Sequence, residues 1–128
     1  MDKQEKGRLG EDAVCKELEK RGHRIIERNY HRRTGEIDII SSVGRFVVFT
    51  EVKSRRLNSM VSGLEAVNFS KQKKIVLTAD LWLTDNRLGL QPRFDVAEVQ
   101  ITGGEYPRVV AVHIYEEAFT GDGIYTIN

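Results

Sequence analysis

Apolar residues recur at helical spacing in two parts of the chain. The first part runs from Lys3 to Arg21, and the glycine that follows it, Gly22, is a typical helix stop. The second lies within residues 62–86, with Ser70 as a candidate N-cap and an earlier start left open. Both patterns predict helices that bury one face. In the second helix, the residues expected to be buried are Val67, Ile75, Ala79 and Trp82.

Five further segments have the alternating or continuous apolar patterns of strands, and turn residues separate them. The predicted order is α-β-β-β-α-β-β, with the residues after Thr120 left unassigned. This order predicts an α/β fold in which a mixed central β-sheet is flanked by helices. The length of 128 residues is typical of a single domain, here residues 1–128. In the fourth strand, Asp95 is expected to have a structural role. The expected strands cover residues 23–30, 36–41, 46–54, 93–101 and 108–119.

The turn between the second and third predicted strands sets the register of their hairpin. Glycine at the first central position favours a two-residue type II′ turn made of Gly44 and Arg45. Val43 then pairs with Phe46. A three-residue loop would instead shift the register and turn each side chain of one strand to the other face.

In the two-residue register, four charged side chains meet at one end of the hairpin. Asp38 falls opposite Glu51 and Glu36 falls opposite Lys53, all on the same face. Two carboxylates with Cβ atoms about 5 Å apart repel each other unless a proton, a lysine or a cation lies between them. One interpretation is a salt-bridge ladder in which Glu36 pairs with Lys53. The other is a site for a hard divalent cation, favoured because the strand from Phe46 is apolar enough to be covered on both faces.

Glu11, in the first helix, is a third candidate acid. Val14, Cys15 and Leu18 follow it at helical spacing, so Glu11 lies on or beside the apolar stripe. Gly7 and Gly10 each weaken this helix by about 1 kcal/mol relative to alanine, and they are expected where another backbone or a ligand comes close. Two interpretations of Glu11 stay open: a metal ligand, or an acid stabilised by the positive end of the helix dipole.

Composition and charge narrow the class of protein. The single cysteine excludes an internal disulfide and fits a reducing compartment. The N-terminus is charged from its second residue and no apolar run is long enough to span a bilayer, so a cytoplasmic protein without a membrane partner is expected. The net charge of +1 predicts no polyanion partner by itself, but basic residues cluster on both sides of the carboxylates. The residues expected to contact nucleic-acid phosphates are Arg32, Arg33, Arg55, Arg56, Lys73 and Lys74.

The segment Glu51-Val52-Lys53, thirteen positions after Asp38, resembles the PD-(D/E)xK signature of restriction-endonuclease-like nucleases. Around it, "GxxGE" at residues 7–11, "RNYHRRTGEIDII", "FTEVKSR", "AVNFSKQKKI" and "RFDV" occur in an order that resembles the YraN family of bacterial proteins. Together these motifs span residues 7–97, most of the chain. The proline that leads the signature is absent, and Ile37 stands before Asp38.

The resemblance implies a restriction-endonuclease-like core and assigns roles by position. Asp38 and Glu51 match the metal-binding acids, and Lys53 matches the motif lysine. Glu11 is similar to the helix glutamate of resolvase-like members. Gln72 is similar to a glutamine that RecB-type nucleases place on the helix after the motif. The catalytic residues implied are Asp38, Glu51, Lys53, Glu11 and Gln72, and the metal ligands implied are Asp38, Glu51, Glu11 and the carbonyl of Val52.

The activity implied is that of a metal-dependent DNA endonuclease, with Mg²⁺ or Mn²⁺ as cofactor and a phosphodiester as substrate. Similarity to archaeal Holliday-junction resolvases extends this expectation to branched DNA and to a homodimer that cleaves two strands symmetrically. Two alternatives stay open. One is a non-catalytic nucleic-acid-binding module with the same fold, and the other is a structural or interaction protein whose acids form an ion-pair network.

Overall fold

Within residues 1–58 and 67–121, which the computed structural model describes, two helices and five strands follow the order predicted from the sequence. No helix in this part of the chain is both long enough and apolar enough to cross a bilayer. The elements are α1 (Lys3–Lys20), β1 (Arg24–Arg32), β2 (Gly35–Val43), β3 (Phe46–Arg56), α2 (Phe69–Asp85), β4 (Gln91–Ile101) and β5 (Val109–Phe119).

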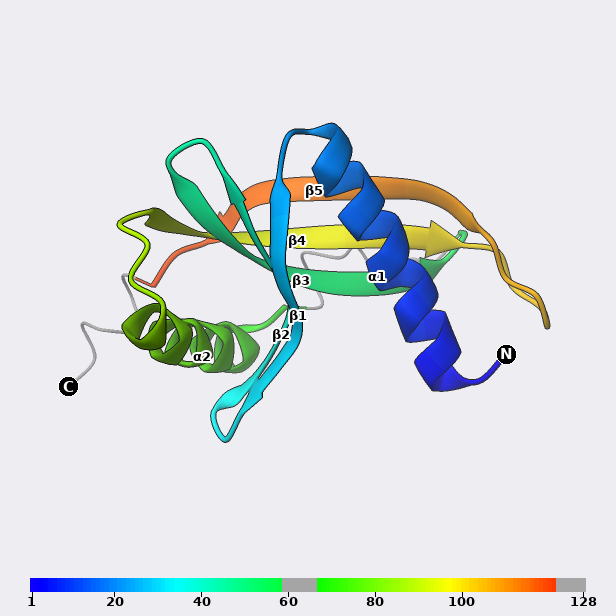
Figure 1. Cartoon of the computed structure of the whole chain (residues 1–128). Coiled ribbons are helices and arrows are strands. Elements are labelled where there is room, and N and C mark those ends of the chain that lie inside the picture. The colour runs from blue at the N-terminus through cyan, green and yellow to red at the C-terminus, as the bar shows by residue number, and fades with distance from the viewer. Residues whose placement is uncertain (59–66, 122–128) are drawn as a thin grey trace.

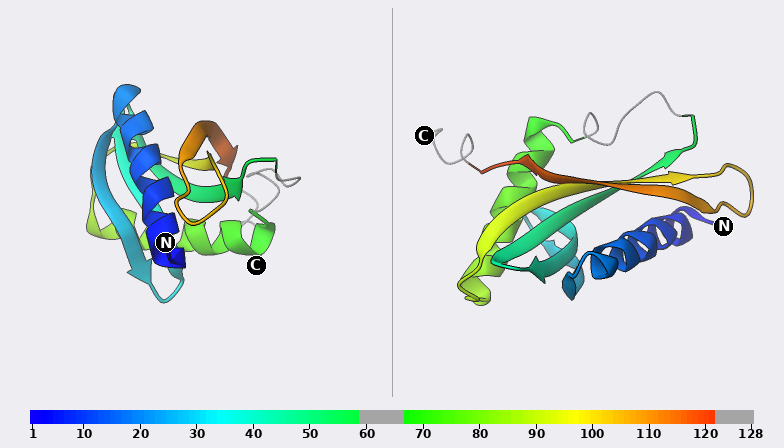
Figure 2. Two further views of the ribbon diagram at one scale, coloured as in Figure 1. Left: turned by 90° about the vertical axis from the view of Figure 1, so that its right-hand side faces the viewer. Right: turned by 90° about the horizontal axis from the view of Figure 1, so that it is seen from above.

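The five strands form one mixed sheet in the order β1-β2-β3-β4-β5. Neighbouring strands are antiparallel except β3 and β4, which are parallel and are joined by the crossover that contains α2. In Figure 1, β1 and β2 cross the long strands β4 and β5 steeply, so the sheet is strongly twisted. Figure 2 shows the β4–β5 hairpin as a long arm, with α1 running along one side of it. The fold is therefore the mixed α/β arrangement expected from the sequence.

The turn between β2 and β3 has the two-residue form that the sequence predicts. Gly44 has a φ of 54°, whereas Arg45 keeps a negative φ, and this combination is that of a type II′ turn. Val43 pairs with Phe46, which confirms the predicted register at the turn. The register matters because it decides which side chains of the two strands share a face.

The two helices cover opposite faces of the sheet. Along β4, Phe94 and Val96 belong to the core under α2, whereas Ala97 and Val99 belong to the core under α1. Consecutive strand residues point to opposite faces, so this alternation separates the two cores. At Gly10, an added Cβ would lie 2.5 Å from the Ser54 hydroxyl, which confirms a close approach of α1 to the sheet there. At Gly7 no described atom lies within 4 Å of such a Cβ, so the same expectation is wrong for that residue. The four residues predicted to be buried in or beside the second helix, Val67, Ile75, Ala79 and Trp82, are all buried.

The turn of the β1–β2 hairpin is docked on α2. The hydroxyls of Thr34 and Thr78 are 2.6 Å apart, and Thr78 also donates to the Lys74 carbonyl at 2.7 Å. Gly35, with a φ of 149°, faces the same helix, and a Cβ there would come within 3.4 Å of the Thr78 hydroxyl. These contacts fix the hairpin turn against α2 next to the end of the sheet where the acidic residues lie.

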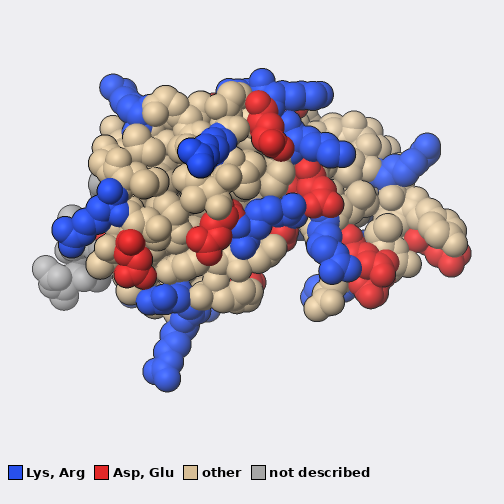
Figure 3. Space-filling model, viewed as in Figure 1, with Lys and Arg blue, Asp and Glu red and all other residues tan. Residues whose placement is uncertain are grey.

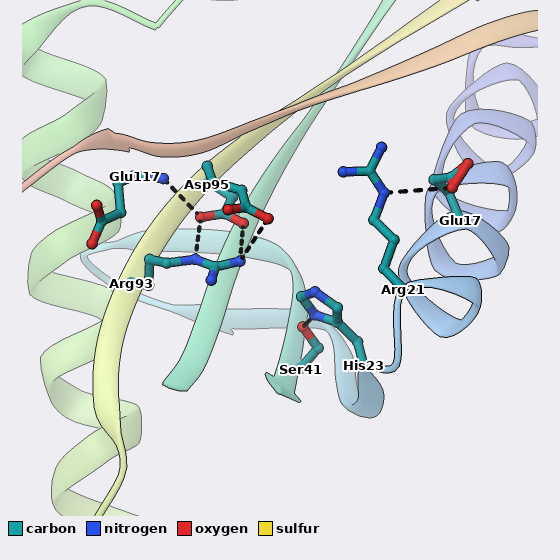
Figure 4. Close-up of polar contacts among 8 residues, drawn as sticks. Glu17, Arg21, His23, Ser41, Arg93, Asp95 and Glu117 are labelled. Carbon is teal, nitrogen blue, oxygen red and sulfur yellow. Dashed lines mark hydrogen bonds and ion pairs between the residues drawn. The ribbon is translucent and has the colours of Figure 1, made fainter. Parts of the chain in front are cut away.

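A buried ion pair occupies the face of the sheet that carries α1. Arg93 donates from Nε and Nη2 to the two carboxylate oxygens of Asp95, at 2.9 and 2.8 Å (Figure 4). The Glu117 amide also donates to Asp95 at 3.1 Å, and Glu117 has a φ of 48° at an irregularity in the pairing of β4 with β5. Nearby, His23 is hydrogen-bonded to Ser41, and burial and then the charge of Arg93 lower the pKa of His23. Asp95 is structural, as the sequence suggested.

Helix α2 begins before the candidate N-cap at Ser70. Asn68 is the N-cap, and its side-chain oxygen accepts a hydrogen bond from the Lys71 amide at 2.9 Å. The prediction of Ser70 is wrong because Asn68 provides an equally good acceptor two residues earlier, which leaves Ser70 inside the first turn. Residues 62–66, part of the segment in which this helix was expected, lie outside the described residues.

The Arg93–Asp95 pair predicts an asymmetric response to mutation. Asp95→Ala leaves a buried guanidinium and the Glu117 amide without their acceptor, so we expect a loss of about 3–5 kcal/mol in the free energy of unfolding. The double substitution Arg93→Met/Asp95→Leu removes both charges and should cost less than Asp95→Ala. Urea denaturation measures both, with Asp85→Asn, which breaks the exposed pair with Arg32, as a control expected to change stability by less than about 0.5 kcal/mol. An Asp95→Ala variant as stable as this control would contradict the interpretation.

Candidate active site

Strand β2 separates from β3 where the acidic residues lie. The last pair in the ladder is Ile39 with Thr50. Two residues further along β3, the Val52 amide faces β2. If the ladder continued, a backbone carbonyl of β2 would accept the hydrogen bond from this amide. Asp38 Oδ2 accepts this hydrogen bond instead, at 2.7 Å. The Asp38 carboxylate therefore takes the place of a backbone acceptor, and this fixes it beside Glu51.

Asp38 and Glu51 line one pocket of about 370 Å³ between β2, β3 and the first turns of α2. The Glu51 side chain is only 7% exposed, so its charge is largely removed from solvent. Buried carboxylates are costly unless a positive group compensates them. The other polar residues that line the pocket are Glu36, Asn68, Ser70, Lys71 and Lys74.

Two lysines share one oxygen of Glu51. Lys71 Nζ, from α2, lies 2.6 Å from Glu51 Oε1, and Lys53 Nζ, from β3, lies 3.3 Å from the same atom. Lys53 was expected at this end of the hairpin, whereas Lys71 was not among the predicted site residues. With Asn68 as the N-cap, Lys71 is the third residue of α2, so the cap would have placed it in the first turn, but no sequence signal brings that turn to Glu51.

The pKa of Asp38 is raised from its ordinary value to about 7. Burial is the main cause, and the neighbouring charge of Glu51 is the second. The hydrogen bond from the Val52 amide acts in the opposite direction because it favours the charged carboxylate, while Glu11 adds a smaller repulsion. At neutral pH this carboxyl group therefore holds a proton part of the time, as expected for a carboxyl group buried beside a second one.

The two lysines respond differently to the same surroundings. Burial lowers the pKa of Lys53, and the nearby Lys71 lowers it further. Burial is also the largest single influence on Lys71 and acts to lower its pKa, but the hydrogen bond to Glu51, the contact with Lys53 and the charges of the two carboxylates together outweigh it, so the pKa of Lys71 is raised. Lys71 is therefore firmly charged, while Lys53 gives up its proton more easily than an ordinary lysine and is closer to what a general base requires.

The predicted pairing of Glu36 with Lys53 is wrong. Glu36 lies opposite His31 in the β1–β2 ladder, and its carboxylate is 3.1 Å from His31 Nε2. The reason is that pairing between β2 and β3 extends from the turn only as far as Ile39. Glu36 lies beyond that point, so the cross-strand register no longer applies to it. Glu36 remains at the edge of the pocket, where it adds negative charge without holding Lys53.

Glu11 is placed beside a basic residue of β1. Its Oε1 atom lies 3.5 Å from Arg28 Nη2, and that guanidinium is held at 2.8 Å by Asp12. Within the described residues Glu11 Oε1 is buried and accepts no hydrogen bond. Its charge is felt at Asp38, but the structure does not join the two acids and Glu51 into one three-ligand group. A direct role in holding a metal stays a prediction.

Gln72 makes a local contact. Its side-chain amide donates to the Val67 carbonyl at 3.0 Å, just before α2, and Gln72 does not line the pocket with Asp38 and Glu51. This hydrogen bond holds the approach to the helix, so in this structure Gln72 supports the position of Lys71. The catalytic role implied by the resemblance stays a prediction.

The six basic residues expected at nucleic acid come from three elements. Arg32 and Arg33 lie at the β1–β2 turn, Arg55 and Arg56 at the end of β3, and Lys73 and Lys74 in α2. Lys74 lines the pocket, whereas Arg32 lies 3.9 Å from Asp85 and Arg55 contacts the Ser54 carbonyl. Figure 3 shows lysine and arginine side chains spread over one face of the molecule, with acidic side chains between them.

The pocket fits a hard divalent cation held by two carboxylates. In the described part of the chain, no three Asp, Glu, His or Cys side chains come together as a ligand set. Mg²⁺, however, is usually held by one or two carboxylates and keeps several waters. The raised pKa of Asp38 and the unsatisfied Oε1 of Glu11 both indicate negative charge that the protein itself does not fully compensate. Asp38 and Glu51 would hold such an ion, with the Val52 carbonyl beside them as the further ligand predicted from the sequence.

Comparison with known proteins gives the family. The model of the "Uncharacterised protein family UPF0102" matches residues 10–99. This chain belongs to the UPF0102 family. It is 42% identical over 104 residues to a UPF0102 protein of Rhodococcus jostii, covering 80% of this chain and 88% of that protein. It is 40% identical over 118 residues to a UPF0102 protein of Syntrophotalea carbinolica, covering 91% and 93% of the two chains.

Membership in UPF0102 confirms the family, of YraN type, that the sequence motifs suggested. The matched segment includes both carboxylates of the pocket and the two lysines that contact Glu51, together with Glu11 and Gln72. The candidate site therefore lies within the part of the chain that defines the family. The relatives' names carry no statement about activity, so function is argued from the pocket.

The raised pKa of Asp38 predicts whether its replacement stabilises or destabilises the metal-free protein. In the unfolded chain this group ionises near pH 4, by ordinary values. Between that pH and about 7, folded protein keeps a proton that unfolded protein has lost, so stability falls as pH rises through this window. Asp38→Asn keeps an acceptor for the Val52 amide and removes the charge. In EDTA at pH 8 it should be more stable than wild type by up to about 4 kcal/mol, the free energy that corresponds to raising the pKa from near 4 to about 7, with little difference near pH 4.

Chemical denaturation at the two pH values measures this effect. Glu105→Gln, at an exposed position before β5, is the matched control and should show no such dependence. If Asp38→Asn is instead less stable than wild type at pH 8, Asp38 stabilises the fold as an ordinary ion-pair partner and the acidic pair is not under repulsion.

Proposed function

We propose that this protein is a metal-dependent DNA endonuclease with a restriction-endonuclease-like core. The observation that carries the proposal is the meeting of Asp38 and Glu51 in one pocket, with Lys53 in contact with Glu51 at 3.3 Å and the pKa of Asp38 raised to about 7. Strongly perturbed groups that gather in a pocket are typical of functional sites. An arrangement that served only stability would not need two adjacent buried carboxylates.

The topology supports the same proposal. The hairpin of β2 and β3 carries the acids, and the crossover through α2 leads to the parallel strand β4. This is the order of elements that the resemblance to restriction-endonuclease-like nucleases implies. The carboxylates lie where β2 and β3 diverge, so the end of the hairpin opens into a pocket that a substrate can reach.

The chemistry follows from the groups in the pocket. A bound Mg²⁺ or Mn²⁺ would polarise a phosphate oxygen and lower the pKa of a bound water. Asp38 and Glu51 would hold the cation, and the hydrogen bond from the Val52 amide keeps Asp38 in place. Lys53, with its lowered pKa, is suited to orient or deprotonate the attacking water, or to stabilise charge at the phosphate.

The proposed substrate is DNA, with branched DNA as the form suggested by the resemblance of the motifs to Holliday-junction resolvases. The six basic residues would contact backbone phosphates, which gives affinity that depends on salt and not on base sequence. The pocket belongs to one small chain, so symmetric cleavage of two strands would need a homodimer.

One observation favours a second candidate, a non-catalytic nucleic-acid-binding module. Lys53 and Lys71 both contact Glu51, so the protein itself supplies part of the compensation that a cation would provide. A site that had lost its chemistry could keep such an ion-pair network. Binding of a divalent cation separates the two candidates.

We expect Mn²⁺ or Mg²⁺ to raise the thermal stability of the wild type, because the cation relieves the repulsion between Asp38 and Glu51. At a concentration one hundred times its Kd, the ion would add about 2.7 kcal/mol to the free energy of unfolding. Thermal melts in EDTA and in Mn²⁺ measure the effect, and it should be absent in Glu51→Gln. Identical melts with and without metal, together with no heat of binding in calorimetry, would favour the non-catalytic module.

Substitutions at the basic residues and at Glu51 should separate substrate binding from cleavage. In EDTA, Arg55→Ala/Arg56→Ala should weaken binding of all DNA sequences and lower the salt slope by about one per lost contact. Glu51→Gln should bind as well as wild type or better, because a charge that repels the phosphate is removed, while cleavage in Mg²⁺ is abolished. Gel-shift salt titrations on a four-way junction and a matching duplex, with cleavage assays, measure these differences.

Equal loss of DNA binding in both variants would mean that the carboxylates are structural and that the nuclease proposal fails. A junction bound no better than the duplex would leave the nuclease proposal standing and remove the preference for branched DNA.

A further inference from the structure

One carboxylate oxygen in the pocket is contacted by two lysine ammonium groups. Glu51 Oε1 is contacted by Lys53 at 3.3 Å and by Lys71 at 2.6 Å. The contact to Lys71 is the shorter, although Lys71 comes from a separate element that reaches the site from the crossover between β3 and β4. A cation bound by Glu51 would have to share or take over this oxygen.

Lys71 is the lysine that can leave. Its side chain is 39% exposed, compared with 18% for Lys53, so it returns to water at lower cost. Its backbone is fixed because its amide donates to the Asn68 cap at 2.9 Å. The side chain can therefore swing while the helix stays in place.

The charges in the pocket show why it would leave. When a cation is bound, Asp38 and Glu51 are both ionised and balance the ammonium groups of Lys53 and Lys71. Glu36 and Lys74, which also line the pocket, offset each other, so a divalent cation adds two unmatched positive charges. One phosphodiester brings one negative charge, and attack by hydroxide on that phosphate brings a second. With both lysines present the pocket is therefore matched in charge to the transition state of hydrolysis, provided that Lys71 has moved from Glu51 to the phosphate.

Resting on the nuclease function proposed above, we infer that Lys71 is a place-holding counter-ion of the metal site. In metal-free protein it occupies Glu51 Oε1 and limits the repulsion between the carboxylates. When a divalent cation takes this oxygen, Lys71 turns to the phosphate of the bound DNA. The first turn of α2 lines the same pocket, and the positive end of its dipole favours a phosphate there.

The test compares Mn²⁺ affinity among variants by calorimetry at fixed ionic strength. Lys71→Met removes the competing charge and should bind Mn²⁺ about fivefold more tightly or better, the lower end of typical coupling between sites. Lys71→Arg keeps the charge and should stay close to wild type. Lys16→Met removes an exposed charge of α1 and controls for net charge. Thermal melts confirm that each variant is folded.

Cleavage at saturating Mn²⁺ is the second readout. Lys71→Met should cleave DNA about tenfold more slowly or worse, because a group that stabilises the phosphate is missing. Tighter Mn²⁺ binding together with slower cleavage supports both roles of Lys71. Mn²⁺ binding no tighter than in Lys16→Met overturns the place-holding role while the nuclease proposal stands. Tighter binding with undiminished cleavage overturns the contact with phosphate. If the wild type neither binds Mn²⁺ nor cleaves DNA, the proposed function fails and the inference with it.

Discussion

The hydrogen bond from the Val52 amide to Asp38 Oδ2 is the contact on which the candidate site depends. Strand β3 is the centre of the sheet, and its buried amides need acceptors on both sides. After Ile39 and Thr50 the backbone of β2 no longer provides one. A side-chain carboxylate fills this position, so the strands can diverge without an unsatisfied amide. The same hydrogen bond therefore allows the two strands to separate and fixes an acid at the point where they separate.

Bringing that acid next to Glu51 creates an electrostatic problem that the rest of the pocket answers. The carboxylates are partly desolvated and repel each other, which raises the pKa of Asp38. Compensation arrives from two directions, through Lys53 on the same strand and through Lys71 on the crossover helix. The docking of the β1–β2 turn on α2 closes the pocket from its third side. Strands β2 and β3 and helix α2, which are separate along the chain, are thus linked by the charges of two carboxylates and two lysines.

The sequence predicted most of the fold because its signals are local. Alternation and turn chemistry at Gly44 were enough to set the hairpin register and to bring Asp38 to Glu51. The same reasoning misplaced Glu36, because alternation assumes that two strands stay paired, whereas β2 and β3 are paired only between the turn and the pair of Ile39 with Thr50. Lys71 was missed for a similar reason. Its place in the site depends on the phase of the helix and on a crossover whose geometry no short sequence window contains.

The irregularity of β5 at Glu117 has a consequence for how the molecule meets other chains. β5 is an edge of the sheet, and a long regular edge presents a row of free amides and carbonyls to which another strand can add. At Glu117 the backbone has a positive φ and its amide turns inward to Asp95, so the row is interrupted. The buried aspartate that stabilises the core therefore also holds an irregularity in this edge strand, a feature that makes the last part of an edge a poorer template for another strand.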